Sequence, residues 1–459
     1  MSAGESPMAG GPAAGFAREG AAASVGARRL RLRGRLNLFQ AAMLRWRDLH
    51  PYNAVHVVRV RKPFEPGRLE AVIAERLLAS GLTGLAIDRK RRRYEYRGGP
   101  ATVDLDIVAA NDDGEAALRA EIERQLNRPF PVDGPLVPFR FFVRDDGGEF
   151  RLGVAYDHFI AAGDSIVVLL NDLVHSYLGA TTTGRKPNLY PATFRPLLAR
   201  NAGTLLRGVH ALARVVASCR RSVRPRYRDH EDGYNGFEWV TLPAPAAVAL
   251  RARAKSLGVT FNDVIIAIIL KACASGAVEI RGSGRRREIA VASIVNLRSE
   301  CGFGDRDAFG QFLSSMRISR RVPDGVRLEE LAEDVHRETA RFKERKLYLQ
   351  MLIAMRINGI IWWFLDAKRR QRFYAKAYPV MAGLTSLNVD ALWQFADRDG
   401  ESRDYVRAVP TGPLAPLVIA ATTSGNALTI GLSYRRSALT AADAAKIASA
   451  VADSVRVLQ

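Results

Sequence analysis

The chain has 459 residues, 48% hydrophobic and 25% charged, a balance that excludes a wholly disordered or collagen-like protein. Its 68 basic and 47 acidic residues give a net charge of +21, which reflects either arginine-rich coding or a surface that attracts nucleic acid, anionic lipid, acidic carriers or phosphates. Three widely spaced cysteines, Cys219, Cys273 and Cys301, provide neither a disulfide framework nor a metal-binding pattern.

The N-terminal residues and the apolar runs indicate the compartment. Residues 1–27 are rich in Gly, Ala and Ser and lack the continuous apolar stretch of a signal peptide. No run elsewhere reaches the ~18 apolar residues that a membrane-spanning helix needs. We therefore expect 1–27 to be a flexible tail and the protein to be cytoplasmic.

The first half alternates between helical and strand patterns. In chain order it predicts a helix, a strand, a helix from Pro66 to Gly81, a strand with a basic turn, and another helix, at 36–50, 54–61, 66–81, 86–97 and 114–127. Two strands at 136–144 and 149–158 then flank the turn signal DDGG, and a helix follows from Ser165 to Leu178. Residues 28–184 are thus predicted to form a mixed α/β lobe.

A basic segment at 185–233 connects this lobe to the next. It contains Arg200, Arg207, Arg214 and Arg221, spaced by seven residues, which places them on one face of a helix. We therefore predict a basic amphipathic helix at 197–221. Such a helix lies either on an anionic membrane surface or against its own protein with a solvated arginine face.

The remainder, 234–459, is predicted to form a second α/β lobe. Strand patterns occur at 237–243, 288–298, 416–422 and 427–434, and helical patterns at 243–258, from 260 onward, through 327–376 and at 440–457. The tract 343–376 is both basic and apolar. It is either a second membrane-facing segment or a half-buried helix bordering a channel.

The segment from Tyr156 to Ser165, YDHFIAAGDS, carries the strongest chemical signal. The preceding strand alternates so that Leu152, Val154, Tyr156 and His158 share its apolar face, which places His158 at the end of the strand. Gly163 permits a tight turn, and Asp164 or Ser165 can cap the next helix. An imidazole at such a position can face a cleft and accept a proton, although a structural histidine fits the same pattern.

These residues resemble the His-x-x-x-Asp-Gly motif of condensation-type acyltransferases. That superfamily includes peptide-synthetase condensation domains, bacterial wax ester synthase/diacylglycerol acyltransferases and chloramphenicol acetyltransferase. Further segments resemble the superfamily in the same order along roughly residues 36–457: LNRPFPVDGPLVPFRFFV (126–143), GVTFNDVIIAIILKA (258–272), IVNLR (294–298), AFGQFLS (308–314) and LTIGLSYRRSALT (428–440).

The motif departs from the superfamily at two positions. Ala162 stands where the superfamily has an Asp that pairs with an Arg from the first-helix region, and Thr83 or Gly84 stands where that Arg is expected. Asp157 replaces the His that often precedes the catalytic one. Loss of both partners of an ion pair can be neutral, whereas restoring Asp at 162 alone is expected to destabilise by leaving an unpaired carboxylate. Asp164 either takes over part of the missing role or caps the helix.

The resemblance implies an α/β fold of two chloramphenicol-acetyltransferase-like lobes that form a pseudo-dimer with a tunnel between them. It implies His158 as general base in direct acyl transfer from the thioester of CoA or of a carrier's phosphopantetheine to a hydroxyl or amine. Asp157, Gly163, Asp164 and Ser165 would support the motif, with Ser165 and the Gly163 amide as candidate oxyanion donors. The implied tunnel residues of the second lobe are Asn262, Asp263, Asn296, Arg298 and Gly310.

The expected partners follow from this assignment. They are a small-molecule acceptor, an acidic acyl carrier protein, and an anionic membrane surface contacted through helix 197–221, at the inner face of the membrane. No permanently bound cofactor, no metal and no nucleic acid are expected, and the protein is expected to be a monomer. The alternative function is a catalytically silent protein of the same fold that binds an acyl carrier or another protein.

Overall fold

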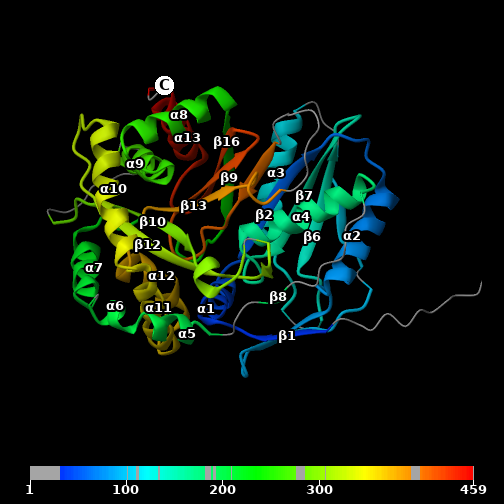
Figure 1. The fold of residues 1–459 in the computed structure, drawn as a ribbon, viewed down its shortest axis with the longest axis horizontal. Helices are drawn as coiled ribbons and strands as arrows, with labels where there is room; N and C mark the ends of the chain where they lie inside the picture. Colours follow the sequence, from blue (N-terminus) through cyan, green and yellow to red (C-terminus); the bar gives the residue numbers. More distant parts are fainter. Residues whose placement is uncertain are drawn as a thin grey trace, which may run out of the picture.

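The computed structural model describes residues 31–100, 102–109, 113–132, 135–180, 188–189, 193–207, 209–274, 285–304, 306–393 and 404–457. The predicted tail at 1–27 lies outside these residues. Figure 1 shows two α/β lobes side by side, the N-terminal lobe in blue to cyan and the C-terminal lobe in green to red.

The N-terminal lobe is built on a five-stranded sheet in the order β14-β2-β7-β6-β5. Its strands are β2 (Asn53–Val60), β5 (Leu105–Ile107), β6 (Phe139–Asp145), β7 (Phe150–Asp157) and β14 (Tyr405–Ala408). Its helices are α1 (Leu38–Arg47), α2 (Pro66–Ser80), α3 (Gly114–Asn127) and α4 (Gly163–Tyr177). A small sheet in the order β1-β4-β3 is formed by β1 (Leu32–Arg35), β3 (Leu85–Asp88) and β4 (Arg93–Tyr96).

Apolar residues alternate along β7, and this alternation divides the core of the N-terminal lobe into two layers. Leu152, Val154 and Tyr156 pack in the same cluster as the buried faces of α2 and α4, whereas Ala155 packs with α3 on the other side. The predicted strand face is therefore confirmed. Helix α4 begins at Gly163, two residues before the predicted start.

The C-terminal lobe is built on a six-stranded sheet in the order β12-β10-β13-β15-β16-β9. Its strands are β9 (Asn235–Leu242), β10 (Ile289–Asn296), β12 (Leu313–Arg320), β13 (Ala382–Asn388), β15 (Leu417–Ser424) and β16 (Ala427–Arg435). Helices α8 (Ala244–Ser256), α9 (Phe261–Ala274), α10 (Leu328–Glu344) and α13 (Ala441–Val457) cover one face and share its hydrophobic core. The helices α11 (Tyr348–Trp363) and α12 (Ala367–Ala377) lie in the lower part of Figure 1.

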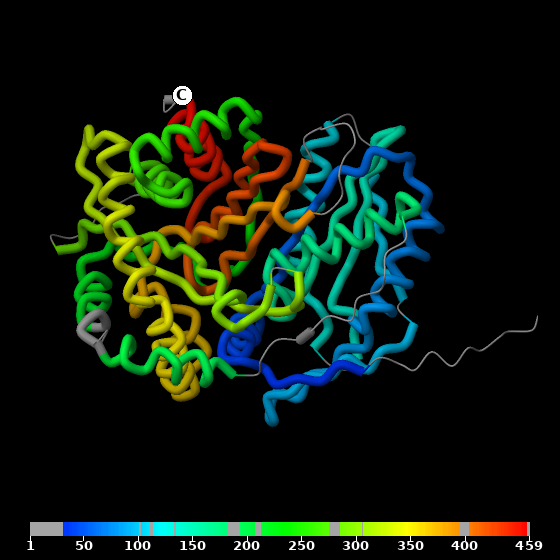
Figure 2. The backbone as a smooth tube through the Cα atoms, viewed as in Figure 1, coloured from blue at the N-terminus to red at the C-terminus, as the bar shows by residue number. Residues whose placement is uncertain are grey.

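Strand exchange joins the two lobes. Strand β14 follows four strands of the C-terminal lobe in the chain, yet it pairs antiparallel with β2, Tyr405 opposite Val58 and Ala408 opposite Val55. Figure 2 shows this segment, in orange, at the boundary between the lobes. A Cβ added to Gly431 of β16 would lie 2.1 Å from the Arg407 carbonyl oxygen, so only glycine permits this approach. Two short strands, β8 (Asn188–Leu189) and β11 (Ala308–Phe309), also pair in parallel.

The connection between the lobes differs from the prediction. The single helix predicted at 197–221 is wrong, because the chain forms α5 (Arg195–Arg200), α6 (Ala202–Arg207) and α7 (Val209–Arg221). Helix α5 ends at Arg200 with Asn201 as its C-cap, and this interruption breaks the register of the predicted arginine stripe. Arg200 donates to the Glu300 carbonyl at 3.0 Å, and Arg221 of α7 pairs with Glu288, so these two arginines contact the second lobe. A 3₁₀ turn covers Ser299–Cys301.

Within the described residues, no single helix is long and apolar enough to cross a membrane. Helices α8 and α9 pass that test only as a pair, by length and composition, and they are bent by 103° relative to each other.

Candidate active site

His158 lies in the turn between β7 and α4, and contacts from both lobes fix its backbone. Its N–H donates to the Tyr52 carbonyl at 3.0 Å. From the second lobe, Gln311 Nε2 donates to the carbonyl of His158 and, at 2.5 Å, to that of Ala161. The position of the imidazole therefore depends on how the two lobes meet.

Aromatic rings surround the imidazole. The ring of Tyr52 lies 5.6 Å from that of His158 and tilted by 31°, and the ring of Tyr156 lies 5.7 Å away, nearly perpendicular. Burial lowers the pKa of His158 to about 4; the Ala161 carbonyl acts in the opposite direction, and the Arg407 cation lowers the pKa further. The ring is therefore neutral at pH 7 and able to accept a proton.

A cavity of about 240 Å³ contains the His158 side chain, and both lobes line it. The first lobe contributes α1, β2, the His158 turn and the start of α4. The second contributes β10, β13, α11 and the segment after β14, with mainly apolar side chains such as Ile294, Leu313, Met351, Met355, Leu384 and Val418. Such a lining suits an apolar substrate segment with few polar groups to orient it.

Two further buried polar residues, Arg407 and His56, line the cavity and were not predicted. Arg407 donates to Thr422 Oγ1 at 2.8 Å and to two backbone carbonyls, and burial lowers its pKa to about 10. His56 Nδ1 lies 2.8 Å from the Tyr405 hydroxyl, and burial holds its pKa well below the usual value. The available signal was a polar residue with apolar neighbours on both sides, in the strand segments NAVHVVRV and YVRA.

Gly163 has a steric reason to be glycine. A Cβ at this position would lie 3.1 Å from Arg407 Nη1 and 3.4 Å from the His56 ring. Gly163 is the first residue of α4, and it lines the cavity beside His158. As the first residue of α4, Gly163 has a backbone N–H without an acceptor inside the helix.

Asp157 pairs with Arg47 of α1. Arg47 Nη1 lies 2.6 Å from Asp157 Oδ2, and both side chains are buried. Burial raises the pKa of Asp157 to about 6, against the attraction of Arg47. The sequence predicts that the motif's ion pair between residue 162 and an arginine of the first-helix region is absent. The structure has an ion pair with a helical arginine at a different position of the motif, between Asp157 and Arg47.

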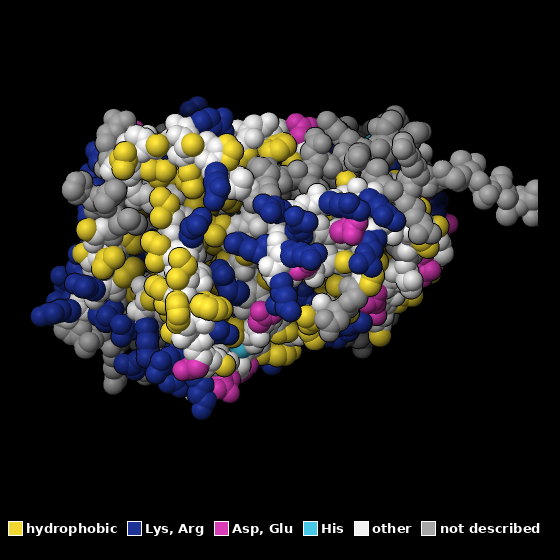
Figure 3. Space-filling view, turned by 90° about the horizontal axis from the view of Figure 1, so that it is seen from below, with side chains coloured by type: hydrophobic (Ala, Val, Ile, Leu, Met, Phe, Trp, Pro, Cys, Tyr) yellow, Lys and Arg dark blue, Asp and Glu magenta, His cyan; other side chains and the backbone are white. Residues whose placement is uncertain are grey.

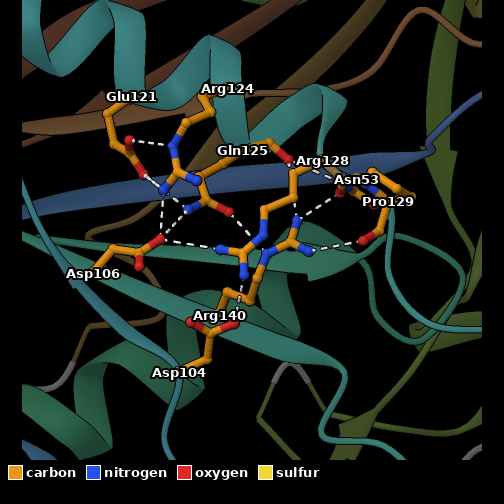
Figure 4. Close-up of polar contacts among 9 residues, drawn as sticks. All are labelled: Asn53, Asp104, Asp106, Glu121, Arg124, Gln125, Arg128, Pro129 and Arg140. Atoms are coloured by element: carbon orange, nitrogen blue, oxygen red, sulfur yellow. Dashed lines mark hydrogen bonds and ion pairs between the residues drawn. The ribbon is translucent and has the colours of Figure 1, made fainter.

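The same arginine also holds the loop after α3. Arg47 Nη2 donates to the carbonyls of Phe130 at 3.0 Å and Pro131 at 2.6 Å. Figure 4 shows how the start of this loop is held from the other side: Arg140 donates to Gln125 and to the Arg128 carbonyl, and Asn53 donates to the carbonyls of Gln125 and Arg128. Because Asn53 pairs with Asp157 across β2 and β7, the network supports the strand end that carries His158.

Asp164 connects the two lobes. Its Oδ1 lies 2.9 Å from Arg298 Nη2 and accepts the Ser165 N–H at 2.8 Å, while Oδ2 accepts from Asn296 Nδ2 at 2.9 Å. Arg298 also donates to Ser165 Oγ at 3.0 Å and to the Ala308 carbonyl at 2.6 Å. Asp164 is thus an interlobe ion-pair partner at the second position of α4, and the helix-capping interpretation is incomplete.

The other predicted residues fall into two groups. Asn296 lines the cavity, whereas Asn262, Asp263, Arg298, Gly310 and Ser165 lie outside the lining. Asp263 instead binds the Thr260, His336 and Thr339 side chains at the start of α9. Ser165 Oγ accepts from the Gly310 N–H at 3.2 Å and from Arg298, and it donates to the Ala308 carbonyl at 3.4 Å.

The remaining motif residues are accounted for as follows. Ala162 is buried at the N-cap of α4, where its N–H donates to the Gly310 carbonyl at 2.9 Å. Thr83 is buried and donates to the Gly99 carbonyl at 2.9 Å. Among the residues that the structure describes, no group of three or more His, Cys, Asp and Glu side chains is placed to hold a metal ion.

Sequence comparison finds no match, neither among known protein families nor among curated proteins. Solved structures do match along almost the whole chain. The first condensation domain of the CDA synthetase aligns with a TM-score of 0.60 at 14% identity, covering 93% of this chain and 95% of that domain. A nonribosomal peptide synthetase cyclization-docking bidomain from Sorangium cellulosum aligns with a TM-score of 0.66 at 12% identity, covering 93% and 84%.

A third match is a complex of the X-domain and OxyB from teicoplanin biosynthesis, whose aligned chain gives a TM-score of 0.55 at 15% identity and coverages of 92% and 93%. Each of these alignments covers more than nine-tenths of this chain, so both of its lobes are matched. The protein therefore has the fold of condensation domains, which consists of two chloramphenicol-acetyltransferase-like lobes.

Proposed function

We propose that this protein transfers an acyl group from a thioester to a hydroxyl or amine acceptor, with His158 as general base. The observation that carries the proposal is a buried, neutral imidazole at the meeting point of two lobes, inside a cavity lined mainly by apolar side chains. Such a cavity can bring two substrates together and exclude water.

In the proposed reaction, His158 accepts the proton of the acceptor's O–H or N–H as its oxygen or nitrogen attacks the thioester carbonyl. The new C–O or C–N bond forms, the C–S bond breaks, and the proton passes to the departing thiolate. The negative charge that develops on the carbonyl oxygen would be stabilised by the Arg407 guanidinium and by the Gly163 N–H at the start of α4, because both residues line the cavity.

The donor is proposed to be an acyl group on CoA or on an acidic acyl carrier protein, and the acceptor a small molecule. The net charge of +21 favours association with either donor, because carriers are acidic and CoA carries phosphates. A tunnel that admits donor and acceptor from opposite sides is part of the proposal.

The test is a transfer assay with acyl-CoA and acyl-carrier donors of several chain lengths and a panel of amines and alcohols. In the His158→Ala variant we expect the rate to fall by about 10²- to 10⁴-fold with folding intact by circular dichroism. His175→Ala, which removes a histidine from the far end of α4, is the matched control and is expected to keep full activity. A His158→Ala variant with unchanged activity would refute the assignment of the base.

The pH profile provides a second readout. With a pKa of about 4, the His158 ring stays neutral as the pH falls from 8 to about 5, so the acid limb of kcat/KM is expected near pH 4 and not near 6.5. If the wild type transfers no acyl group from any donor but binds an acyl carrier, the catalytically silent alternative is favoured.

We further propose that the protein acts at the inner face of the membrane, by contact with anionic lipid. Several large apolar side chains are exposed on the helices named above: Trp363 is 76% exposed, Phe364 73% and Leu206 73%. Figure 3 views the molecule from below and shows hydrophobic side chains gathered beside many Lys and Arg side chains. Exposed aromatic residues flanked by cations are typical of interfacial membrane binding.

Sedimentation with vesicles tests this surface. We expect binding to phosphatidylglycerol vesicles that weakens with salt and is lost in Trp363→Ser/Phe364→Ser, and weaker binding to phosphatidylcholine. Equal binding of that variant and the wild type would contradict the proposal.

A further inference from the structure

A second pocket lies behind the wall of the His158 cavity. Its volume is about 330 Å³, and it is formed by α7, the start of α11, the end of α12 and β12. Five side chains line both this pocket and the His158 cavity, so the two spaces lie against opposite sides of one thin wall, which consists of Ser315, Met351, Ala354, Asn358 and Tyr378.

The lining of this second pocket is strongly cationic. It contains five basic side chains and no Asp or Glu among the described residues, namely Arg220, Arg224, Arg286, Arg317 and Lys376. Among the described residues, none of these five lies close enough to a carboxylate to form an ion pair, although Arg317 acts on the pKa of Glu338 from a greater distance. Uncompensated cations repel one another, so their concentration in one hollow indicates an anionic ligand.

The deepest cation is part of a built site. Arg317 is 4% exposed, and its guanidinium donates to Ser222 Oγ at 2.6 Å and to the Pro379 carbonyl at 3.0 Å. Its Nε and the Tyr378 hydroxyl are both buried and have no hydrogen-bond partner among the described residues. Arg317 lies 5.5 Å from the centre of the Tyr378 ring. Two unsatisfied donors thus remain in the wall of a cationic hollow.

Two further arginines of this pocket, Arg286 and Arg224, are held by backbone carbonyl groups. Arg286 Nη1 donates to the carbonyls of Cys219 at 3.1 Å and Ser222 at 2.8 Å, at the end of α7. Arg224 Nη2 donates to the Lys376 carbonyl at 3.4 Å, which joins α12 to the segment after α7. Burial raises the pKa of the Cys219 thiol although Arg317 and Arg286 act against it, so this thiol stays protonated at neutral pH.

We infer that this pocket binds the anionic head group, phosphate or carboxylate, of a substrate whose apolar chain extends along α11 toward His158. Arginine forks bind two oxygens of such a head group at once. The wall side chains Met351 and Ala354 offer apolar contact to the chain. The direction toward His158 rests on the proposed function, whereas the binding of the head group does not.

Binding is tested by calorimetry with octyl phosphate, octanoate and, as a neutral control, octanol. The variant removes the three exposed rim cations, Arg220→Gln/Arg224→Gln/Lys376→Gln. The matched control removes three exposed cations of α7 and α12 that do not line the pocket, Arg214→Gln/Lys368→Gln/Arg372→Gln. Both variants carry the same net charge, and all six side chains are exposed, so folding is expected to be unaffected.

We expect the wild type to bind both anions and not octanol, with affinity that falls with salt. The rim variant is expected to lose about tenfold or more in affinity and the control variant less than about twofold. The ratio of octyl phosphate to octanoate affinity separates a phosphate ligand from a carboxylate ligand. Equal losses in both variants, or no loss in either, would overturn the inference.

The direction of the chain has its own test. Ala354→Trp fills the shared wall and is expected to weaken octyl phosphate while leaving inorganic phosphate unchanged; equal effects on both would overturn the direction. His158→Ala is expected to bind octyl phosphate as the wild type does. Retained transfer in His158→Ala, with octyl phosphate still bound, would thus count against the proposed function alone. Transfer by the wild type with no binding of either anion would count against this inference alone.

Discussion

Two buried Asp–Arg pairs flank His158, and they differ in what they connect. Asp157, one residue before the histidine, pairs with Arg47 inside the N-terminal lobe. Asp164, six residues after it, pairs with Arg298 from the C-terminal lobe. The first pair fixes the strand end against α1, and the second fixes the start of α4 against the other lobe. The turn that carries His158 is therefore held at both ends by charge.

The two carboxylates also differ in their compensation. Asp164 receives three donors, from Arg298, Asn296 and the Ser165 N–H. Asp157 has Arg47 as its ion-pair partner at 2.6 Å, and burial nevertheless raises its pKa to about 6. A buried carboxylate is well compensated only when hydrogen bonds satisfy both oxygens in addition to the charge. We therefore expect the two pairs to respond differently when the arginine is removed.

Removing the interlobe arginine is expected to have the larger effect. Arg298 is 1% exposed, and Arg298→Met replaces it with an apolar side chain of similar length. Because Asp164 then lacks its charge partner, the free energy of unfolding is expected to fall by about 3–5 kcal/mol. Acyl transfer is expected to fall as well, because α4 lines the cavity. Urea denaturation and the transfer assay measure the two effects.

The double variant Arg298→Met/Asp164→Asn is the control for this pair. With both charges gone, no buried carboxylate is left unpaired, and stability is expected to recover in part. A double variant that is as unstable as Arg298→Met alone would show that Arg298 acts through its bonds to Ala308 and Ser165 and not through Asp164.

Removing the intralobe arginine is expected to have a smaller and pH-dependent effect. In Arg47→Met the pKa of Asp157 rises beyond its present value of about 6, so the carboxyl takes up a proton and escapes the cost of an unpaired charge. The unfolded carboxyl, with a pKa of about 3.9, stays ionised in this range. The folded state thus binds more protons, and the stability of the variant relative to the wild type is expected to increase as the pH falls from 8 to 5.

The expected deficit of Arg47→Met is about 1–3 kcal/mol at pH 8, including the lost bonds to the loop after α3. Denaturation curves of variant and wild type at pH 8, 7, 6 and 5 measure it. A deficit that is the same at all four pH values would mean that Asp157 is not the group left uncompensated.

The sequence was sufficient to predict the secondary structure around the site but not the pairing. Alternation of apolar residues along β7 and the helix after Gly163 are local patterns, and both predictions are confirmed within two residues. Arg47 lies on the predicted first helix, yet nothing local indicates that it meets Asp157. Such pairs depend on how distant segments pack, which periodicity does not encode.

For the predicted helix at 197–221, the local pattern itself was misleading. Arginines at a spacing of seven residues fit one helical face, but spacing alone does not show where a helix ends. Helix α5 ends at Arg200, and its C-cap Asn201 has a non-helical conformation and donates from its side chain to the Leu197 carbonyl at 2.8 Å. Arg407 and His56 were missed for another reason: each lies between apolar residues of a strand, and the sequence does not show which distant residues surround it.

The smallest expected change in stability comes from Ala162→Asp, which adds a third carboxylate between Asp157 and Asp164. Ala162 lies between Asp157 and Asp164, at the N-cap of α4 with an extended backbone and no side-chain cap. From the sequence, Ala162→Asp is expected to destabilise. The structure predicts a smaller effect, because an Asp at the N-cap stabilises the helix by about 1 kcal/mol and this gain offsets the cost of burying its carboxylate. The free energy of unfolding is therefore expected to change by no more than about 1 kcal/mol.

The activity of Ala162→Asp is the more sensitive readout. A carboxylate at this point of the cavity lining favours the charged imidazole, so it raises the pKa of His158 and moves the acid limb of kcat/KM upward from near 4. Ala162→Asn caps the helix without charge and is expected to leave the limb in place. An Ala162→Asp variant that is as unstable as Arg298→Met would show that a carboxylate at position 162 neither caps α4 nor finds a cationic partner. In that case the turn would accommodate only the two carboxylates of Asp157 and Asp164.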